Sequence, residues 1–213
     1  MNAKRLVPLS GVIAVVLIFA SFVATGSNPK ADAPVDELVA FYSKHSTAQT
    51  VSGVLLSLGA LFFLIFSATV ADTLRAARSE SAGSSALCLG GGVLLVAGLE
   101  LFAGLGIAVG DLTGHVNRSA LQALHVLGQD TVFLFPVTIG TSAFLLGAGA
   151  GALKSAALPK WLGWMAILFA IVAAIPSHVL GGVLDHIGIL ALAGLGVWTL
   201  IVAVLLAMRT DSP

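Results

Sequence analysis

The chain has very little charge. Of its 213 residues, 9% are Asp, Glu, Lys or Arg, against about 25% in an average soluble domain. The formal net charge is zero, and no basic cluster is dense enough to follow a phosphate backbone, so no nucleic acid partner is expected. In contrast, 58% of the residues are hydrophobic and the mean hydropathy is +1.05. No soluble core hides that much apolar surface, so the sequence predicts a membrane protein surrounded by the lipid bilayer.

Cysteine and catalytic motifs are also scarce. The single cysteine, Cys88, has no partner for an intramolecular disulfide and lies in an apolar run, where a thiol behaves as a small hydrophobic group. The sequence has no HExxH zinc signature and no Ser-His-Asp arrangement with motif support, and the glycines at 90–92 start no phosphate loop. Asn117-Arg118-Ser119 matches a glycosylation acceptor, but we expect no modification in a bacterial protein. No cofactor is specified.

Six apolar runs are long enough to cross a membrane. A spanning helix needs about 20 mostly apolar residues, because the hydrocarbon core is about 30 Å thick and each helical residue rises about 1.5 Å. The runs are unbroken, whereas barrel strands alternate over segments of about ten residues. We therefore predict an all-α polytopic protein with one membrane domain over residues 1–213. Its spans cover residues 7–25, 50–71, 85–109, 130–153, 161–179 and 185–208.

The basic residues predict the orientation of these spans, because cytoplasmic loops carry an excess of Lys and Arg. With the N-terminus inside, the cytoplasmic segments hold seven basic residues and the outer loops hold three. The seven are Lys4, Arg5, Arg75, Arg78, Lys154, Lys160 and Arg209, and the three are Lys30, Lys44 and Arg118. We expect both termini in the cytoplasm and the chain in a bacterial plasma membrane.

The first run could instead be a secretory signal, because Lys4 and Arg5 precede it and Ala31-Asp32-Ala33 resembles a cleavage site. The run is longer than a typical signal core, and the candidate cleavage site lies well beyond its end. We interpret it as a retained spanning helix.

Two segments outside the spans have amphipathic patterns. After Pro34, two acidic residues are followed by Leu38, Val39 and Tyr42 at helical spacing, which predicts a short helix on the outer membrane surface. Between Ser119 and Leu127, leucines recur every three residues. This second segment is predicted either as another surface helix or as an extension of the fourth span.

Glu100 is the most unusual residue, since it lies within the third span with no Lys or Arg at its depth. A charged side chain at the centre of a span costs about 2.5 to 3.5 kcal/mol on insertion scales, so such residues are candidate functional sites. The alternative is a neutral glutamic acid bonded to a neighbouring helix, for which Ser57 and Thr138 lie at a suitable depth. We expect Glu100 to point into the bundle and to be neutral near pH 7.

All five histidines fall in the outer half or the outer loops of the predicted topology. Imidazole and carboxylate groups are ligands that zinc, copper and iron sites use, and histidine also senses pH near neutrality. The candidate metal ligands are Asp111, His115, His125, His178 and His186. Plain solvation at the membrane interface is the alternative, which also covers His45.

Two prolines suggest a pocket on the same side. Pro136 in the fourth span and Pro176 in the fifth each remove a backbone hydrogen bond, and a kink there can open a cavity between helices. Simple bending is the alternative. We predict an outward-facing pocket whose candidate ligand-binding residues are Glu100, His125, Asp130, Thr138 and His178.

Small residues recur four apart inside the spans, as at Gly106 and Gly110 or at Ala143, Gly147 and Gly151. Such spacing lets helix backbones approach closely in lipid. It predicts tight packing within one chain, with homodimerisation as the alternative.

The segment Leu158-Pro159-Lys160-Trp161-Leu162-Gly163-Trp164 and the stretch Asp36-Glu37-Leu38-Val39-Ala40-Phe41-Tyr42 carry a resemblance to a known group. With the richness in Ala, Gly and Val, the chain resembles the actinobacterial, DUF4386-like group of multi-span membrane proteins. The group has no settled activity, so the resemblance implies the topology and no functional residue.

Three functions are compatible with these patterns. The leading hypothesis is a non-catalytic membrane protein that acts as an accessory or interaction partner, or binds a lipid or small ligand between its helices. The alternatives are a small proton-coupled transporter that uses Glu100 with the outer histidines, and a membrane metalloenzyme with a metal site on the outer side. Expected partners are the bilayer and either another membrane protein or a second copy.

Overall fold

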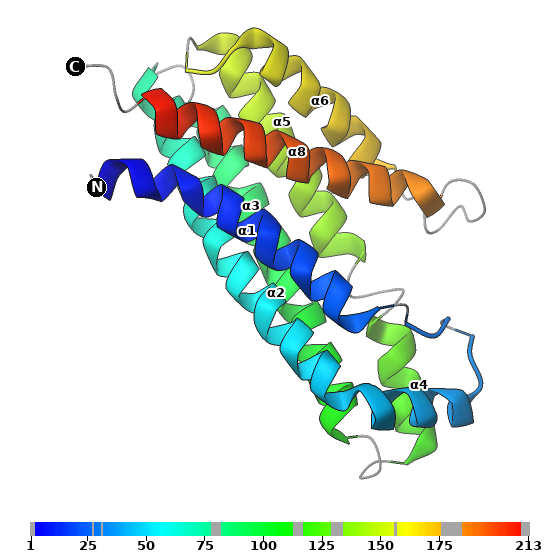
Figure 1. Ribbon diagram of the computed structural model, residues 1–213. Coiled ribbons are helices and arrows are strands. Elements are labelled where there is room, and N and C mark those ends of the chain that lie inside the picture. Colours follow the sequence, from blue (N-terminus) through cyan, green and yellow to red (C-terminus); the bar gives the residue numbers. More distant parts are fainter. Residues whose placement is uncertain are drawn as a thin grey trace.

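A computed structural model describes residues 3–26, 28–30, 32–77, 82–112, 117–128, 134–155, 157–175 and 185–209. Within these ranges the chain forms seven helices and no strand, which confirms the predicted all-α class (Figure 1). The helices are α1 (Ala3–Thr25), α2 (Val35–Ala77), α3 (Ala82–Leu112), α4 (Arg118–Val126), α5 (Leu134–Lys154), α6 (Lys160–Ala174) and α8 (Asp185–Arg209).

Six of these helices form a closed ring in chain order. Each helix contacts the next from α1 through α2, α3, α5 and α6 to α8, and α8 returns to α1. Figure 1 shows that α1 begins and α8 ends at the same end of the molecule, which we call the terminal end. At the opposite end, α4 packs on α2 and α3. Elements distant in sequence therefore meet mainly where the ring closes and where α4 is attached.

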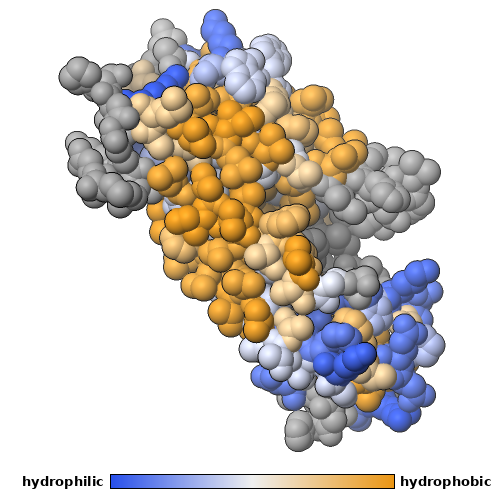
Figure 2. Space-filling view, in the orientation of Figure 1, coloured by the Kyte–Doolittle hydropathy of each residue, from blue (hydrophilic) through white to orange (hydrophobic). Residues whose placement is uncertain are grey.

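Five of the ring helices, α1, α2, α3, α5 and α8, are long and apolar enough to cross a membrane. The sixth, α6, has only 15 residues and a length of about 22 Å, which is less than the hydrocarbon thickness of about 30 Å. Among the described residues, five full spans are therefore found where the sequence predicted six. In Figure 2, apolar side chains cover the middle of the visible face and hydrophilic residues gather at the α4 end.

Proline explains why α6 is short. The predicted fifth span ran to residue 179 with a kink at Pro176, but α6 ends at Ala174. Ile175 has φ −73° and ψ 122°, an extended conformation. A proline ring disfavours the helical conformation of the residue before it, so Pro176 accounts for the extended conformation of Ile175 at the end of α6. Pro176 itself lies outside the described residues.

The other proline, Pro136, is the third described residue of α5, which the structure describes from Leu134 onward. It packs against α3, since a Cβ atom added at Gly98 would lie 2.9 Å from the Pro136 Cβ. Residues 129–133 lie outside the described residues, so the kink expected at Pro136 and the start of the fourth span at residue 130 stay predictions.

A glycine seam joins α3 to α5. Gly91 and Gly98 on α3 lie seven residues apart, as do Gly140 and Gly147 on α5. A Cβ atom added at Gly91 would lie 2.1 Å from the Phe144 backbone nitrogen, and one at Gly147 would lie 2.3 Å from the Cys88 backbone nitrogen. Glycine is required because the two backbones touch. The predicted tight packing within one chain is confirmed here.

Aromatic side chains and a few interhelical hydrogen bonds fill the ring. Trp198 is fully buried on α8, and its ring centroid lies 5.7 Å from that of Phe144, which in turn lies 5.1 Å from that of Phe63. The Trp198 indole N–H donates to the Leu162 carbonyl at 3.0 Å, which ties α8 to α6. Ser142 ties α5 to α6 by donating to the Ala170 carbonyl at 2.9 Å.

Candidate functional site

The α4 end of the molecule is a small unit of its own, which we call the cap: residues Val35–Lys44 of α2 together with α4. Its Leu38, Tyr42 and Leu121 pack with Ala33, which precedes α2, and with Val109 of α3 into an apolar core separate from that of the ring. The predicted helix after Pro34 does form, but it is continuous with the second spanning helix. Its apolar stripe packs on α3 and α4: Leu38 is 0% exposed and Tyr42 is 5% exposed.

A kink separates the cap from the rest of α2. His45 has φ −114° and ψ 16°, outside the helical range. Its imidazole Nδ1 donates to the Phe41 carbonyl at 2.8 Å, four residues earlier, where a backbone N–H would normally bond. A side chain that enters the hydrogen-bond ladder is one of the recognised causes of a helix kink. His45 therefore has a structural role at the junction.

The second cap helix, α4, is fixed at its beginning. The Asn117 side chain accepts a hydrogen bond from the Ala120 N–H at 2.7 Å, as a helix N-cap does. Arg118 then pairs with Asp36 of α2 at 2.7 Å, although both side chains are largely exposed. Asn117 therefore has a structural role as the N-cap of α4. The helix is separate from α5 and does not extend it.

His125 fastens α4 to the rest of the protein. Its ring is 2% exposed, with Nε2 3.1 Å from the Lys30 carbonyl and Nδ1 2.8 Å from the Tyr42 hydroxyl. A carbonyl only accepts, so Nε2 carries the proton, and in the neutral ring Nδ1 accepts from the Tyr42 hydroxyl. Both ring nitrogens are therefore used, which leaves none for a metal ion.

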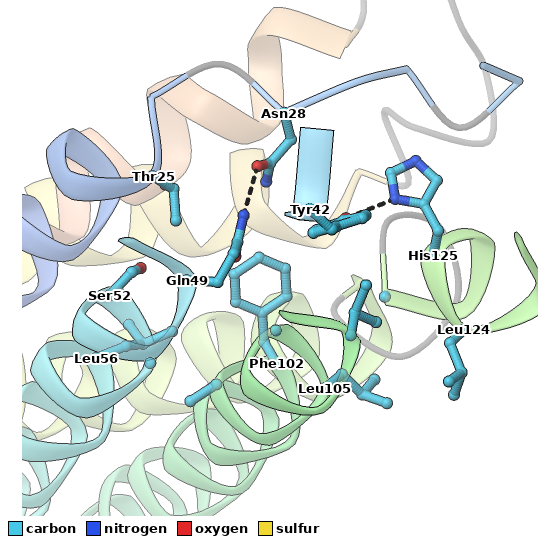
Figure 3. Close-up of a pocket in the computed structure, with 15 residues that line it drawn as sticks. Thr25, Asn28, Tyr42, Gln49, Ser52, Leu56, Phe102, Leu105, Leu124 and His125 are labelled. Atoms are coloured by element: carbon cyan, nitrogen blue, oxygen red, sulfur yellow. Dashed lines mark hydrogen bonds between the residues drawn. The ribbon is translucent and has the colours of Figure 1, made fainter. Parts of the chain in front are cut away.

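Beneath the cap lies a partly enclosed pocket with a volume of about 40 Å³ (Figure 3). Its polar lining comes from α1, the link to α2, α2 itself and α4: Thr25, Asn28, Tyr42, Gln49, Ser52 and His125. Its apolar lining includes Leu56, Phe102, Leu105, Val109 and Leu124. Figure 3 shows Thr25, Asn28, Tyr42 and His125 along one side and Leu56, Phe102 and Leu105 along the other.

The polar side of the pocket is held by an amide pair. Gln49 Nε2 donates to Asn28 Oδ1 at 3.2 Å, across the junction between α2 and the link that follows α1. Gly26 makes this link possible, since its φ of 65° is a left-handed conformation that glycine adopts easily at the end of a helix. The turn at Gly26 brings Asn28 back over the pocket.

The lining limits the chemistry of the pocket. Its described residues include no Asp, Glu, Lys, Arg or Cys, and its one imidazole already uses both nitrogens. Hydroxyl and amide groups bind neutral polar groups, but without a base or an activating charge they do not make a nucleophile. The arrangement favours the binding of an uncharged molecule over catalysis.

Glu100 lies elsewhere, in a groove of about 280 Å³ on the outside of the ring between α2 and α3. The Ser57 hydroxyl donates to Glu100 Oε2 at 2.7 Å, which confirms the predicted bond to another helix. The side chain is exposed, so the prediction that it points into the bundle is wrong. The reason is the glycine seam: Gly98 faces α5, and Glu100 lies about 200° further around the helix.

The remaining predicted site residues are not brought together among the described residues. Thr138 is half-buried on α5 and does not line the cap pocket, and Asp111 is exposed in the last turn of α3. His115, Asp130 and His178 lie outside the described residues, as does the side chain of His186 in the first turn of α8. No group of three His, Cys, Asp or Glu side chains in the described part could hold a metal. The convergence around His178 stays a prediction.

Several pocket residues were missed by the sequence reasoning. Gln49, Ser52, Gly53 and Leu56 have the spacing of one helix face, and Gln49 is a long polar residue just before an apolar run. A polar residue on the face that also carries Gly53 and Leu56 could have been taken as pointing inward. Asn28 carried no such signal, because its position depends on a turn.

No protein-family model, no curated protein and no solved structure matches this chain.

Proposed function

We propose that this chain is an integral membrane protein without catalytic activity, which binds a small uncharged amphipathic molecule, such as a lipid head group or a neutral metabolite, beneath the cap. The observation that carries the proposal is the lining of the cap pocket. Thr25, Asn28, Tyr42 and His125 lie along one side, Leu56, Phe102 and Leu105 lie along the other, and no described lining residue has an acidic or basic side chain other than the imidazole. Such a division suits a molecule with one polar and one apolar part.

The size of the pocket supports a small ligand or the head of a longer one. A water molecule needs about 10 to 15 Å³ of this kind of volume, so 40 Å³ corresponds to about three water molecules. Any larger part of the ligand lies outside the partly enclosed pocket or requires the cap to move. The kink at His45 is a suitable hinge, since it lies where the cap joins the ring.

The proposed location is a bacterial plasma membrane with both termini in the cytoplasm and the cap outside. The seven-to-three distribution of basic residues and the shared position of the two termini at one end support this orientation. In this orientation six helices enter the bilayer, and α6 would reach only part of the way across it.

Reporter fusions after Ala77 and Arg209 should read cytoplasmic, and one after Ala33 should read external. An external signal after Arg209 would rule out an even number of crossings.

The test of ligand binding uses native mass spectrometry of the gently solubilised protein. The spectrum is examined for a constant mass in addition to that of the chain, which would come from a molecule that the protein retains from its own membrane. The variant is Gln49→Leu, which removes the amide pair with Asn28. The matched control is Gln122→Leu on the exposed face of α4.

We expect the wild type and Gln122→Leu to carry the same added mass and Gln49→Leu to lose it. A wild-type protein without any added mass would contradict the proposed function. An added mass equally present in Gln49→Leu would place the binding site elsewhere.

The two alternative functions have less support. A proton-coupled carrier would use Glu100 together with the outer histidines, yet Glu100 lies in the external groove and His125 in the cap. A metalloenzyme would need side chains that are free to coordinate a metal ion, and both imidazole nitrogens of His125 are already hydrogen-bonded. Proton uptake in liposomes that Glu100→Gln abolishes would favour the carrier, and stoichiometric metal after purification would favour the metalloenzyme.

A further inference from the structure

The outward face of α3 carries a second row of small residues. Gly83, Gly90, Ala97 and Gly104 follow one another at seven-residue intervals, and all four are exposed. A Cβ atom added at any of the three glycines would meet no described atom within 4 Å. Large exposed side chains flank the row: Leu87, Val93, Leu94 and Leu101. No described element therefore packs on this row, and its Gly104 end lines the groove that holds Glu100.

The chain itself shows what a row with this spacing does. On the inward face of the same helix, Gly91 and Gly98 repeat at seven residues and bring the α3 backbone against α5. A seven-residue repeat keeps one stripe of a helix against its partner, and small residues let the backbones approach. The outward row has the same spacing and the same residue types, but it has no partner within the described chain.

A polar pair borders the outward row. Glu100 lies between Ala97 and Gly104, and its Oε2 accepts from Ser57. In the groove that these residues share with Gly53 and Ile107, Glu100 and Ser57 are the only polar side chains among the described lining. A carboxyl group exposed to hydrocarbon is unfavourable, and one hydroxyl satisfies only part of its hydrogen-bonding capacity. The groove therefore favours an occupant that brings another hydrogen-bonding group into the membrane.

We propose that this face of α3 is the interface between two copies of the chain, with the two Glu100 side chains facing each other across a two-fold axis. A two-fold interface places the same patch opposite itself. A protonated carboxyl is both a donor and an acceptor, so it can pair with an identical group. The small-residue row likewise fits against its own copy. This inference does not depend on ligand binding beneath the cap.

The experiment is disulfide cross-linking in native membranes with Ala97→Cys. The natural Cys88 is 0% exposed inside each copy, so it does not reach a second copy. The matched control is Val16→Cys on α1, where the side chain is 58% exposed on a different helix. We expect a covalent dimer of twice the chain mass for Ala97→Cys and none for Val16→Cys.

Two further variants separate the interface from general aggregation. Gly90→Leu, combined with Ala97→Cys, adds bulk to the row at a position where a Cβ atom meets no described atom within 4 Å, and it should abolish the cross-link. Glu100→Gln keeps a group that donates and accepts and should preserve the cross-link, whereas Glu100→Leu should reduce its yield. An Ala97→Cys protein that stays a single copy would overturn the proposal. A cross-linked product of another mass would do the same, because the partner would then be a different protein.

Discussion

The ring and the cap are held together by different means. In the ring, glycines at Gly91 and Gly147 bring backbones into contact, and apolar side chains fill the interior. The cap has a much smaller apolar core, and hydrogen bonds add to it: His125 joins Tyr42 and Lys30, and Asn117 begins α4. Close backbone contact resists opening along its whole length, while a small core and a few hydrogen bonds resist it less. We therefore expect the cap to open more easily than the ring.

The largest effect is expected at the glycine seam. Gly91→Leu places a side chain where a Cβ alone would lie 2.1 Å from the Phe144 backbone nitrogen. We expect a loss at the upper end of the range for overpacking, about 3 kcal/mol or more, and a large fall in the melting temperature in detergent. At the adjacent Gly90, an added Cβ atom meets no described atom within 4 Å, so Gly90→Leu should lower the melting temperature much less, by no more than the loss of contact with a second copy. Equal melting of the two variants would contradict the seam.

The next effect is local to the cap. His125→Leu leaves the Lys30 carbonyl and the Tyr42 hydroxyl without this partner, and unpaired buried groups cost about 1 to 3 kcal/mol each. We expect faster deuterium exchange in α4 and in Val35–Lys44, with unchanged exchange in α5. Tyr42→Phe removes one of the two bonds and should show a smaller change in the same peptides. An increase spread over the whole ring would show that the cap is not a separate unit.

A smaller effect is expected at the start of α4. Asn117→Ala removes the acceptor for the Ala120 N–H, and the loss of such an N-cap costs about 1 kcal/mol. Exchange should rise in the first turn of α4 more than at His125. A substitution by Ser, which also caps helices, should restore most of the protection. Equal exchange in the Asn117→Ala and Asn117→Ser variants would contradict the role of Asn117 as the N-cap of α4.

The smallest effect is expected for the ion pair between Asp36 and Arg118. Both side chains are largely exposed, at 76% and 68%, so their pairing is worth at most about 1 kcal/mol and is weakened by salt. Asp36→Asn should change cap exchange slightly at low salt and not at high salt. A large effect that salt leaves unchanged would mean that the pair is shielded from solvent.

The difference between the ring and the cap also explains which features could be predicted from the sequence. The predicted run 185–208 is helical throughout, within α8 (Asp185–Arg209), because an unbroken apolar run in lipid has few alternatives to a helix. The direction of Glu100 was predicted wrongly, because it depends on which face of α3 packs. The spacing of Gly91 and Gly98 indicates the packed face of α3. It is a seven-residue repeat, whereas the prediction used small residues that recur four apart.

The cap was less predictable for a physical reason. Tyr42 and His125 are 83 residues apart, and Lys30 contributes only a backbone carbonyl, which no side-chain pattern reveals. The helix after Pro34 was predicted, but its apolar stripe fits a membrane surface and a protein surface equally well. Its burial against Val109 and Leu121 required the position of α4. An outward-facing pocket was predicted from two prolines, Glu100 and the outer histidines. Of its five candidate residues, only His125 lines the cap pocket among the described residues.

Hydrogen–deuterium exchange of the unmodified protein tests most directly whether the cap opens as a unit over its pocket. The account predicts that the amides of Val35–Lys44 and of α4 exchange together and much faster than those around Gly91 and Gly140, where α3 and α5 touch. Loss of protection should begin near His45, where α2 is kinked. Equal protection of the cap and of the α3–α5 seam would contradict it.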